Sequence, residues 1–321
     1  PIPGDILFVN KGTPGRVCLV PDPVDFCIAQ DMIALRADES KIYPKYLFAV
    51  LRSREIQQQI YNTNVGDVIP HFKKQFLDQL LIPIPERSIQ ESIGDLYYVL
   101  SLKAERNKKI NDNLQQQAMA LYAEMFLNSS DNNVTSGTLS DIAVITMGQS
   151  PSGSSYNEDG IGEVFYQGRA EFGFRFPKRR LFTTEPKRMA EAGDVLLSVR
   201  APVGDLNVAY ERCCIGRGLG AIHSKTGHSS FVLYTMFALK SQLDVFNGEG
   251  TVFGSINRDA LNAIPIDVPL VTKIDRFEAI AHPIDELIRT NYEENCRLEA
   301  IRDSLLPKLM SGEIDVSAVQ L

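Results

Sequence analysis

The chain has 321 residues, of which 44% are hydrophobic and 23% charged, and its formal net charge is −7. This composition indicates a globular protein of about two domains, and no apolar run approaches the roughly 18 residues of a membrane span. The acidic balance argues mildly against a nucleic-acid partner. The five cysteines lack C-x-x-C spacing, which excludes a disulfide framework and a zinc site. Nothing at the N-terminus looks like a secretion signal, so we expect a cytoplasmic protein.

Residues 1–86 are predicted to form the first globular domain. The pair Gly4-Asp5 precedes a short apolar run, turn residues follow, and a second apolar run covers residues 17–20. This order of signals predicts a β-hairpin. An apolar helical pattern over residues 46–60 and an Ile-Pro run at residues 82–85 come next.

A long helix is predicted over residues 87–128, because side chains of one kind recur there every seven positions. One expected seam is Ile93, Leu100, Asn107, Leu114 and Leu121, and a second is Leu96, Lys103, Ile110 and Gln117. This period is typical of a coiled coil, in which a buried Asn fixes the register at a cost in stability.

The rest of the chain repeats this order. Residues 129–137 are polar and are predicted to be a linker, and residues 138–270 form a second domain whose Gly193-Asp194 pair lies 189 positions after Gly4-Asp5. A second long helix is predicted over residues 271–310, followed by a tail at 311–321. Its expected seams are Phe277, Ile284, Asn291, Leu298 and Leu305, and Ile280, Leu287, Glu294 and Ile301.

We therefore expect an α+β protein with two globular domains separated by two long helices. Two equal units with paired helices are most easily related by a twofold axis, which predicts an antiparallel coiled coil with pseudo-twofold symmetry. The second copy has about 55 residues before its Gly-Asp pair and the first has three, so the first domain is expected to be incomplete at its N-terminus. Two ordinary amphipathic helices, each packed on its own domain, are the open alternative.

Basic residues gather in one segment of the second copy, where seven of them stand against two glutamates between Arg169 and Arg188. Arginine, lysine, amide and hydroxyl side chains are the groups that reach phosphates and base edges. The candidate DNA-binding residues are Gln149, Ser150, Gln167, Arg169, Arg175, Lys178, Arg179, Arg180, Ser255, Asn257, Lys11, His71, Lys73 and Lys74. Each of them, taken singly, is also compatible with an ordinary solvated surface.

Motifs of catalysis are missing from the sequence. There is no G-x-x-x-x-G-K-[ST] loop, no S-x-x-K nucleophile and no Asn/Asp-Pro-Pro-aromatic motif, and the four histidines lack metal-ligand spacing. The glycine-rich run at residues 216–220 does not match a dinucleotide fingerprint and is interpreted as a turn. We therefore expect no catalytic residue, no metal and no cofactor on this chain.

The run I-R-D-S-L-L-P-K-L-M-S-G-E-I at residues 301–314 resembles the C-terminal end of the specificity subunits of type I restriction-modification enzymes. The Gly-Asp hairpins and the domain–helix–domain–helix order are similar to that family over the full length. The resemblance implies two target-recognition domains that each read half of a split DNA site, and helices that dock modification (methyltransferase) subunits. It also implies a restriction (endonuclease/translocase) subunit as partner.

Under the same resemblance, S-adenosylmethionine, ATP and Mg would bind only to the partner subunits. A second copy of this chain is a further candidate partner, since it would supply the missing part of the first domain. The residues expected to dock partner subunits are Tyr97, Tyr98, Met119, Tyr122, Met125, Tyr292 and Met310. The rival hypothesis is a tandem-repeat scaffold that binds proteins and no DNA.

Overall fold

The structure is a computed structural model that describes residues 1–63, 70–128, 134–248 and 254–314. It divides into two compact units, each of which is described by itself. The first comprises residues 1–110 and 290–321, and the second comprises residues 111–289. In the described part of the chain, no helix combines the length and the apolar character that a membrane crossing needs.

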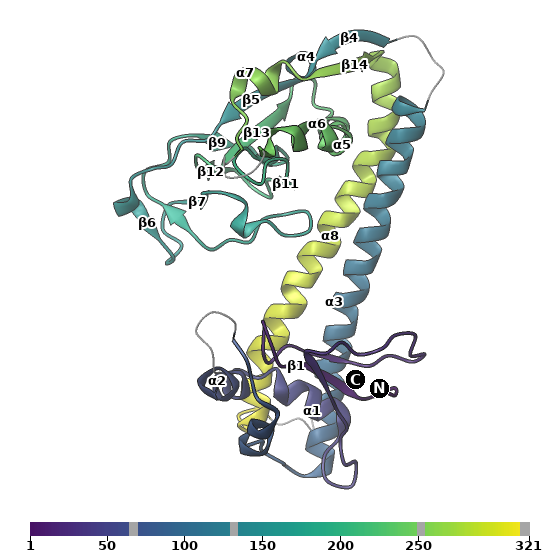
Figure 1. Cartoon of the computed structure of the whole chain (residues 1–321), viewed down its shortest axis with the longest axis vertical. Coiled ribbons are helices and arrows are strands. Elements are labelled where there is room, and N and C mark those ends of the chain that lie inside the picture. Colours follow the sequence, from purple (N-terminus) through teal and green to yellow (C-terminus); the bar gives the residue numbers. More distant parts are fainter. Residues whose placement is uncertain (64–69, 129–133, 249–253, 315–321) are drawn as a thin grey trace. The chain divides into compact units, whose positions relative to one another are not determined.

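The first unit contains a three-stranded antiparallel sheet in the order β2 (Val17–Leu19), β1 (Ile6–Val9), β3 (Met32–Leu35) (Figure 1). The predicted hairpin is confirmed, because β1 pairs with β2, and β3 pairs with the other side of β1. The hairpin is followed along the chain by the helices α1 (Pro44–Leu51) and α2 (Arg54–Thr63) and by the 3-10 helix η1 (Lys74–Gln79).

The core of the first unit joins this sheet to the ends of the two long helices. Apolar side chains from β1 and α1 pack there with Ile93, Leu306 and Leu309. Gly94 allows the close approach, because a Cβ atom at this position would lie 2.6 Å from the backbone nitrogen of Tyr46. A hydrogen in place of a side chain therefore lets α1 rest directly on the long helix.

The second unit contains three sheets among its described residues. One is a four-stranded antiparallel sheet, in the order β11 (Leu206–Val208), β10 (Val195–Ser198), β13 (Leu219–Ser224), β5 (Ala143–Met147). The second has the order β6 (Tyr156–Asn157), β8 (Phe182–Thr183), β7 (Glu163–Tyr166), β12 (Cys213–Ile215), β9 (Met189–Ala190). The helices are α4 (Leu139–Ile142), α5 (Ser229–Ala238), α6 (Lys240–Asp244) and α7 (Arg258–Asn262), with 3-10 turns η3 (Gly153–Ser155), η4 (Arg169–Glu171) and η5 (Val245–Asn247).

The third sheet corrects the predicted linker. Residues 134–137 belong to β4 (Val134–Thr138), which pairs antiparallel with β14 (Pro265–Pro269). A short polar segment shows no apolar alternation, and its strand exists only because a distant strand supplies the hydrogen-bond partner. Residues 129–133 of that linker, and residues 315–321 of the expected tail, lie outside the described residues.

The repeat extends to individual backbone hydrogen bonds. In the first unit Phe72 N donates to Asn10 O at 2.8 Å, and in the second unit Ile256 N donates to Val199 O at 3.0 Å. Both pairs fix the loop before η1 or α7 against the tip of the corresponding hairpin. The two copies therefore share one frame built from the hairpin, the next strand and the following helix.

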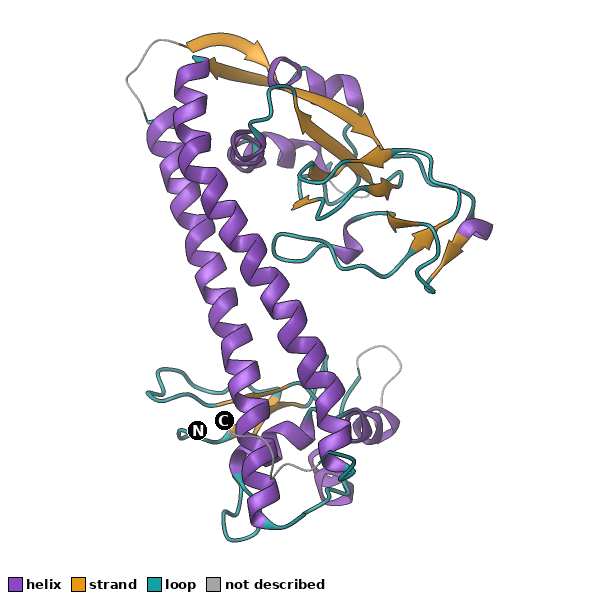
Figure 2. Ribbon diagram, turned by 180° about the vertical axis from the view of Figure 1, so that it is seen from behind, coloured by secondary structure: helices purple, strands orange, loops and turns teal. Residues whose placement is uncertain are grey.

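Two long helices run through both units, α3 (Arg87–Tyr122) and α8 (Val271–Met310). A π-helical turn, η2 (Ala123–Leu127), continues α3. Figures 1 and 2 show the two helices side by side and antiparallel. Within the first unit, the side-chain amide of Asn107 donates to Glu294 Oε2 at 2.7 Å and to Asn295 Oδ1 at 3.0 Å.

One of the two predicted seams is wrong by one residue in both helices. The buried second seam is Tyr97, Ala104, Asn111 and Ala118 on α3, and Ala281, Ile288, Asn295 and Leu309 on α8. The predicted positions Ile110, Ile280, Leu287 and Ile301 are exposed instead. The heptad pattern allows both choices, because positions three residues and positions four residues after the first seam both recur every seven residues. The small side chains Ala104 and Ala118 occupy the inner position because they let the backbones approach.

Candidate nucleic-acid interface

Three loops of the second unit meet at the ends of β5, β7 and β12, and we call this surface the loop edge (residues 148–150, 167–169 and 216–218). Backbone hydrogen bonds join the loops: Gln149 N donates to Ile215 O at 2.9 Å, and Gly216 N donates to Tyr166 O at 2.8 Å. Because the backbone groups are paired in this way, the three loops form one continuous surface.

Glycines are required for this close approach. A Cβ atom at Gly148 would lie 2.2 Å from the carbonyl oxygen of Gly216, and one at Gly216 would lie 2.8 Å from Cα of Gln167. Both distances are shorter than any tolerable contact, so a side chain at either position would separate the loops. The glycine-rich run interpreted as a turn is in fact the packing point of the loop edge.

The side chains of the loop edge have the chemistry of base and phosphate contacts. Gln149 and Gln167 are exposed, while Ser150 is half-buried and accepts a hydrogen bond from Arg217 N at 3.2 Å. A glutamine amide can pair with adenine through two hydrogen bonds, and a guanidinium can do so with guanine. Arg217 is exposed and has no ion-pair partner among the described residues. The sequence analysis did not select it.

Arg200 lies next to the loop edge, at the tip of the β10–β11 hairpin. Val199 N donates to Gly218 O at 2.9 Å, and Ala201 N donates to Gly254 O at 3.0 Å, so the tip is held on both sides. Arg200 forms an isolated antiparallel bridge with the predicted residue Ser255. Its side chain is exposed and, within the described parts of the chain, no carboxylate forms an ion pair with it.

In the first unit, Lys11 occupies the position at the hairpin tip that Arg200 occupies in the second. It forms an isolated antiparallel bridge with His71, and Gly12 N donates to Pro70 O at 2.9 Å. The exposed residues Lys73 and Lys74 follow directly, so the structure brings the four predicted residues of this unit together. Lys11 and Arg200 are 189 positions apart, as the Gly-Asp pairs are. Aligning the two copies would therefore have identified Arg200.

The basic segment is largely neutralised by ion pairs. Arg169 pairs with Asp205 at 2.5 Å, and Arg180 pairs with Glu171 at 2.6 Å. Arg179 pairs with Glu211 and stacks over the ring of Tyr210. Lys178 is exposed and forms no ion pair with any described residue. A cation already paired gains less from a phosphate, because the first pair must be broken or shared.

Arg175 is not available to DNA, so its selection from the sequence was wrong. Its side chain is 4% exposed, and its guanidinium donates to Asp285 Oδ1 at 2.8 Å and to Gln115 Oε1 at 3.0 Å. Tyr234 donates to the same Asp285 oxygen at 2.8 Å, and burial raises the pKa of its phenol. This polar cluster holds the 169–180 segment on α3 and α8.

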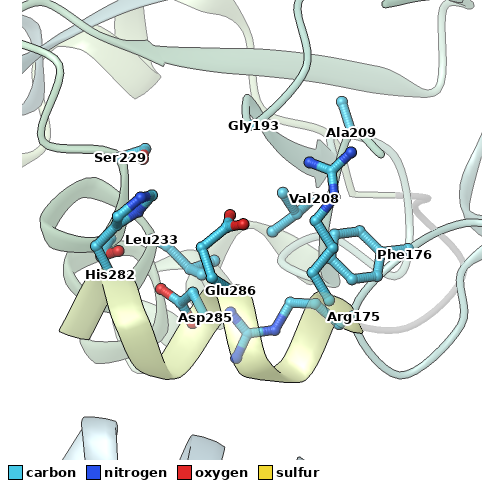
Figure 3. A pocket seen from close by; sticks show the side chains of 12 residues that line it. Arg175, Phe176, Gly193, Val208, Ala209, Ser229, Leu233, His282, Asp285 and Glu286 are labelled. Atoms are coloured by element: carbon cyan, nitrogen blue, oxygen red, sulfur yellow. Dashed lines mark hydrogen bonds and ion pairs between the residues drawn. The ribbon is translucent and has the colours of Figure 1, made fainter. Parts of the chain in front are cut away.

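A pocket lies beside this cluster (Figure 3). His282, Asp285 and Glu286 project into it from α8, opposite Arg175 and Phe176. Its charged groups serve packing within the second unit, since Arg175 and Asp285 are paired with each other.

Asn257 also has a role inside the fold. Its side chain accepts a hydrogen bond from Ala260 N at 2.9 Å and caps α7, which begins at Arg258 as a short helix. A capping side chain satisfies a backbone N–H that the helix leaves unpaired. Ser255 remains exposed beside Arg200.

Most of the residues that were expected to dock partner subunits are buried or half-buried. Tyr97 and Tyr122 are buried in the cores of the first and second unit, so both selections were wrong. Met125 and Met310 pack against the same cores, Tyr98 and Tyr292 are half-buried, and only Met119 is exposed. Tyr97 and Tyr122 fill spaces between the two long helices that the heptad pattern had assigned to other residues. The exposed large apolar residues of α3 and α8 are Val99, Ile110, Met119, Val271, Ile280, Leu287 and Ile301.

Comparison with known families gives a match over the first part of the chain. Residues 1–116 match the model of the type I restriction modification DNA specificity domain. A curated relative is the MjaX specificity subunit ascribed to a type I restriction enzyme of Methanocaldococcus jannaschii. It is 29% identical, and the alignment covers 98% of this chain and 79% of the relative.

Solved structures give a corresponding result. The S subunit of a type I restriction-modification system from M. genitalium aligns with a TM-score of 0.62 at 17% identity, over 96% of this chain and 83% of its own, which shows a shared fold. The HsdS subunit from Thermoanaerobacter tengcongensis is 27% identical, covering 97% of this chain and 81% of that chain, with a TM-score of 0.45.

Proposed function

Because the chain is similar to the specificity subunits of type I restriction-modification systems, we propose that it belongs to that family and binds DNA at a bipartite target, with each unit reading one half of the site. It is a non-catalytic subunit of that system. The modification and restriction subunits would carry out methylation and cleavage. S-adenosylmethionine, ATP and Mg would then bind to those subunits.

The observation that carries this proposal is the repeated cation at the hairpin tip. Lys11 and Arg200 are held by equivalent bridges, to His71 and Ser255 respectively. Both are exposed and, among the described residues, neither is neutralised by a carboxylate. A fixed, unpaired cation beside amide and hydroxyl side chains suits a phosphate contact that orients base-reading groups.

Salt-dependent binding tests the phosphate contacts. We expect Arg200→Ala and Arg217→Ala each to weaken binding to specific and random duplexes alike, and to lower the slope of log K against log salt by about 1. The measurement is fluorescence anisotropy at several salt concentrations, on the full chain with its modification subunits. Arg212→Ala is the matched control, because Arg212 is also exposed but is paired with Glu163 and Glu191.

Base readers should behave differently from phosphate contacts. Gln149→Ala or Gln167→Ala should relax sequence choice at one position, with a loss of discrimination of roughly 1–3 kcal/mol. Arg179→Ala should have a smaller effect than Arg200→Ala, because Arg179 is already paired with Glu211. A scaffold that binds only proteins would show no salt-sensitive DNA binding in any of these combinations, and that result would reject the proposal.

The docking of partner subunits is assigned to the exposed apolar residues of the helices. Ile280 and Leu287 lie seven residues apart on the part of α8 that belongs to the second unit, and both are exposed. Exposed apolar side chains in a regular row on a helix are typical of a binding face for another helix. Leu287→Asp should weaken co-purification of the modification subunits, whereas Arg276→Asp, an exposed change on the same helix, should not.

A further inference from the structure

A second pair of basic residues recurs in the two copies, shortly after the segment that binds each hairpin. Lys74 begins η1 in the first unit, and Arg258 begins α7 in the second. They are 184 positions apart, as are Phe72 and Ile256, whose backbone N–H groups donate to the two hairpins. Lys74 and Arg258 therefore occupy equivalent positions of the shared frame.

Buried contacts hold the chain directly before each of these basic residues. Phe72 is completely buried, and its ring packs against the ring of Phe8 with 5.3 Å between the centroids. Ile256 is 3% exposed and belongs to the core of the second unit. The hydrogen bonds to the hairpins add to this packing, so Lys74 and Arg258 extend from a fixed backbone.

Neither basic side chain is neutralised within the described part of the chain. Both are exposed, and no carboxylate among the described residues forms an ion pair with either of them. The nearest acidic residues in the sequence are Asp78, four positions after Lys74, and Asp259, directly after Arg258. An exposed cation without an internal partner keeps its full attraction for a phosphate, because no existing ion pair must be broken.

Each of these residues lies close to the cation at the tip of its hairpin. Arg200 forms a bridge with Ser255, three residues before Arg258. In the first unit, Lys11 forms a bridge with the residue three positions before Lys74. The Cα atoms of the two cations in a unit are therefore at most about 17 Å apart, a span that covers several successive phosphates of one DNA strand.

Building on the DNA binding proposed above, we propose that Lys74 and Arg258 each bind a second phosphate, in addition to the one bound by Lys11 or Arg200. Each unit then holds the backbone of its half-site at two points. A single contact leaves a unit free to rotate about that contact, whereas two contacts define its orientation on the duplex. The second cation therefore sets the direction from which base-reading side chains approach the groove.

Neutral substitutions in the DNA backbone test this assignment. Single phosphates of the preferred duplex are replaced by uncharged methylphosphonates, and binding to the full chain with its modification subunits is measured by fluorescence anisotropy. Arg258→Ala should make binding insensitive to replacement at one phosphate of one half-site that matters to the unaltered chain. Lys74→Ala should do the same at one phosphate of the other half-site. A contact that has already been removed from the protein cannot be lost again from the DNA.

Salt dependence with matched controls separates a phosphate contact from a general change of charge. Arg258→Ala and Lys74→Ala should each lower the slope of log K against log salt by about 1, for specific and random duplexes alike. Arg258→Lys should keep the slope, because the charge is retained. Arg276→Ala on α8 and Arg54→Ala on α2 remove exposed arginines that form no ion pair with a described residue, and they should leave the slope unchanged.

The outcomes distinguish this assignment from the proposed function. If the unaltered chain binds DNA in a salt-dependent manner, but either Arg258→Ala or Lys74→Ala retains the slope and the sensitivity to every methylphosphonate, the second cation is not a shared phosphate contact and the proposed function stands. If the unaltered chain with its modification subunits shows no salt-sensitive DNA binding, both are wrong.

Discussion

At the scale of single residues, each Gly-Asp pair anchors its unit through a buried carboxylate. Asp5 accepts a hydrogen bond from Ile2 N at 2.8 Å and pairs with Arg36 at 2.7 Å, and the hydrogen bond from Arg36 holds the pKa of this carboxyl at about 2. In the second unit the partner of Asp194 is His223, at 2.6 Å. The two equivalent anchors therefore have different partners, an arginine in the first unit and a histidine in the second.

The Asp5–Arg36 pair makes a prediction about stability and pH. Arg36→Ala should lower the free energy of unfolding at neutral pH, because the buried carboxylate of Asp5 loses its charged donor. A folded pKa below the ordinary value contributes stability that is present above about pH 4 and is lost as pH falls toward 2. The difference between the two proteins should therefore shrink between pH 4 and pH 2 in urea titrations.

The control for this experiment is Arg54→Ala, an exposed arginine on α2 that forms no ion pair with a described residue. It should leave the unfolding curve unchanged at every pH. A stability difference for Arg36→Ala that stays constant down to pH 2 would contradict the role assigned to Asp5.

At the scale of elements, polar residues lie where the two long helices pack. Within the first unit, Asn107 is 1% exposed and its amide contacts both Glu294 and Asn295. Buried amides are satisfied in only one relative position of the helices, so they define register at a cost in stability. The hydrogen bond from Asn107 also lowers the pKa of the Glu294 carboxyl.

Substitution of Asn107 tests this role. Asn107→Ala should cost roughly 1–3 kcal/mol in urea denaturation, because the buried side-chain oxygen of Asn295 loses its donor. The double change Asn107→Leu with Asn295→Leu should recover stability, since both polar groups are removed together. Asn113→Ala, on the exposed face of α3, should be nearly neutral. If the double variant proved less stable than Asn107→Ala, the amide pairing would not explain the cost.

At the scale of the whole molecule, the chain contains two copies of one structural frame. The frame comprises a hairpin, a third strand and a helix that packs on a long helix, and it recurs down to the bridges Lys11–His71 and Arg200–Ser255. In the second copy this frame is accompanied by the loop edge and a second core. If both units read DNA as proposed, the length of the helices would enter the recognition of the site.

A change in helix length tests that consequence. Duplicating seven residues in both α3 and α8, around Asn107 and Asn295, should lengthen the spacer of the preferred site by about three base pairs. Seven helical residues add roughly 10.5 Å, and one base pair spans about 3.4 Å. Selection from a duplex library with variable spacers, in the presence of the modification subunits, measures this. An insertion in only one helix breaks the pairing of seams and should abolish binding, and an unchanged spacer in the double insertion would contradict the model.

The amino-acid sequence by itself determined the features that depend on local patterns. The Gly-Asp hairpins, the two long helices, the repeat and the resemblance of residues 301–314 follow from periodicity and from residues close together in the chain. These patterns identify elements because the local backbone preferences and the alternation of apolar residues act over a few positions.

Only the tertiary structure decided which side chains are available. Arg175 and Asp285 are 110 positions apart, and their ion pair removes from the surface an arginine that looked equivalent to its neighbours. Arg200 and Arg217 are free because no acidic residue of the described chain folds back onto them. Which heptad seam is buried also depends on partners distant in sequence. Burial and ion pairing are properties of contacts between remote segments, and those contacts exist only in the folded chain.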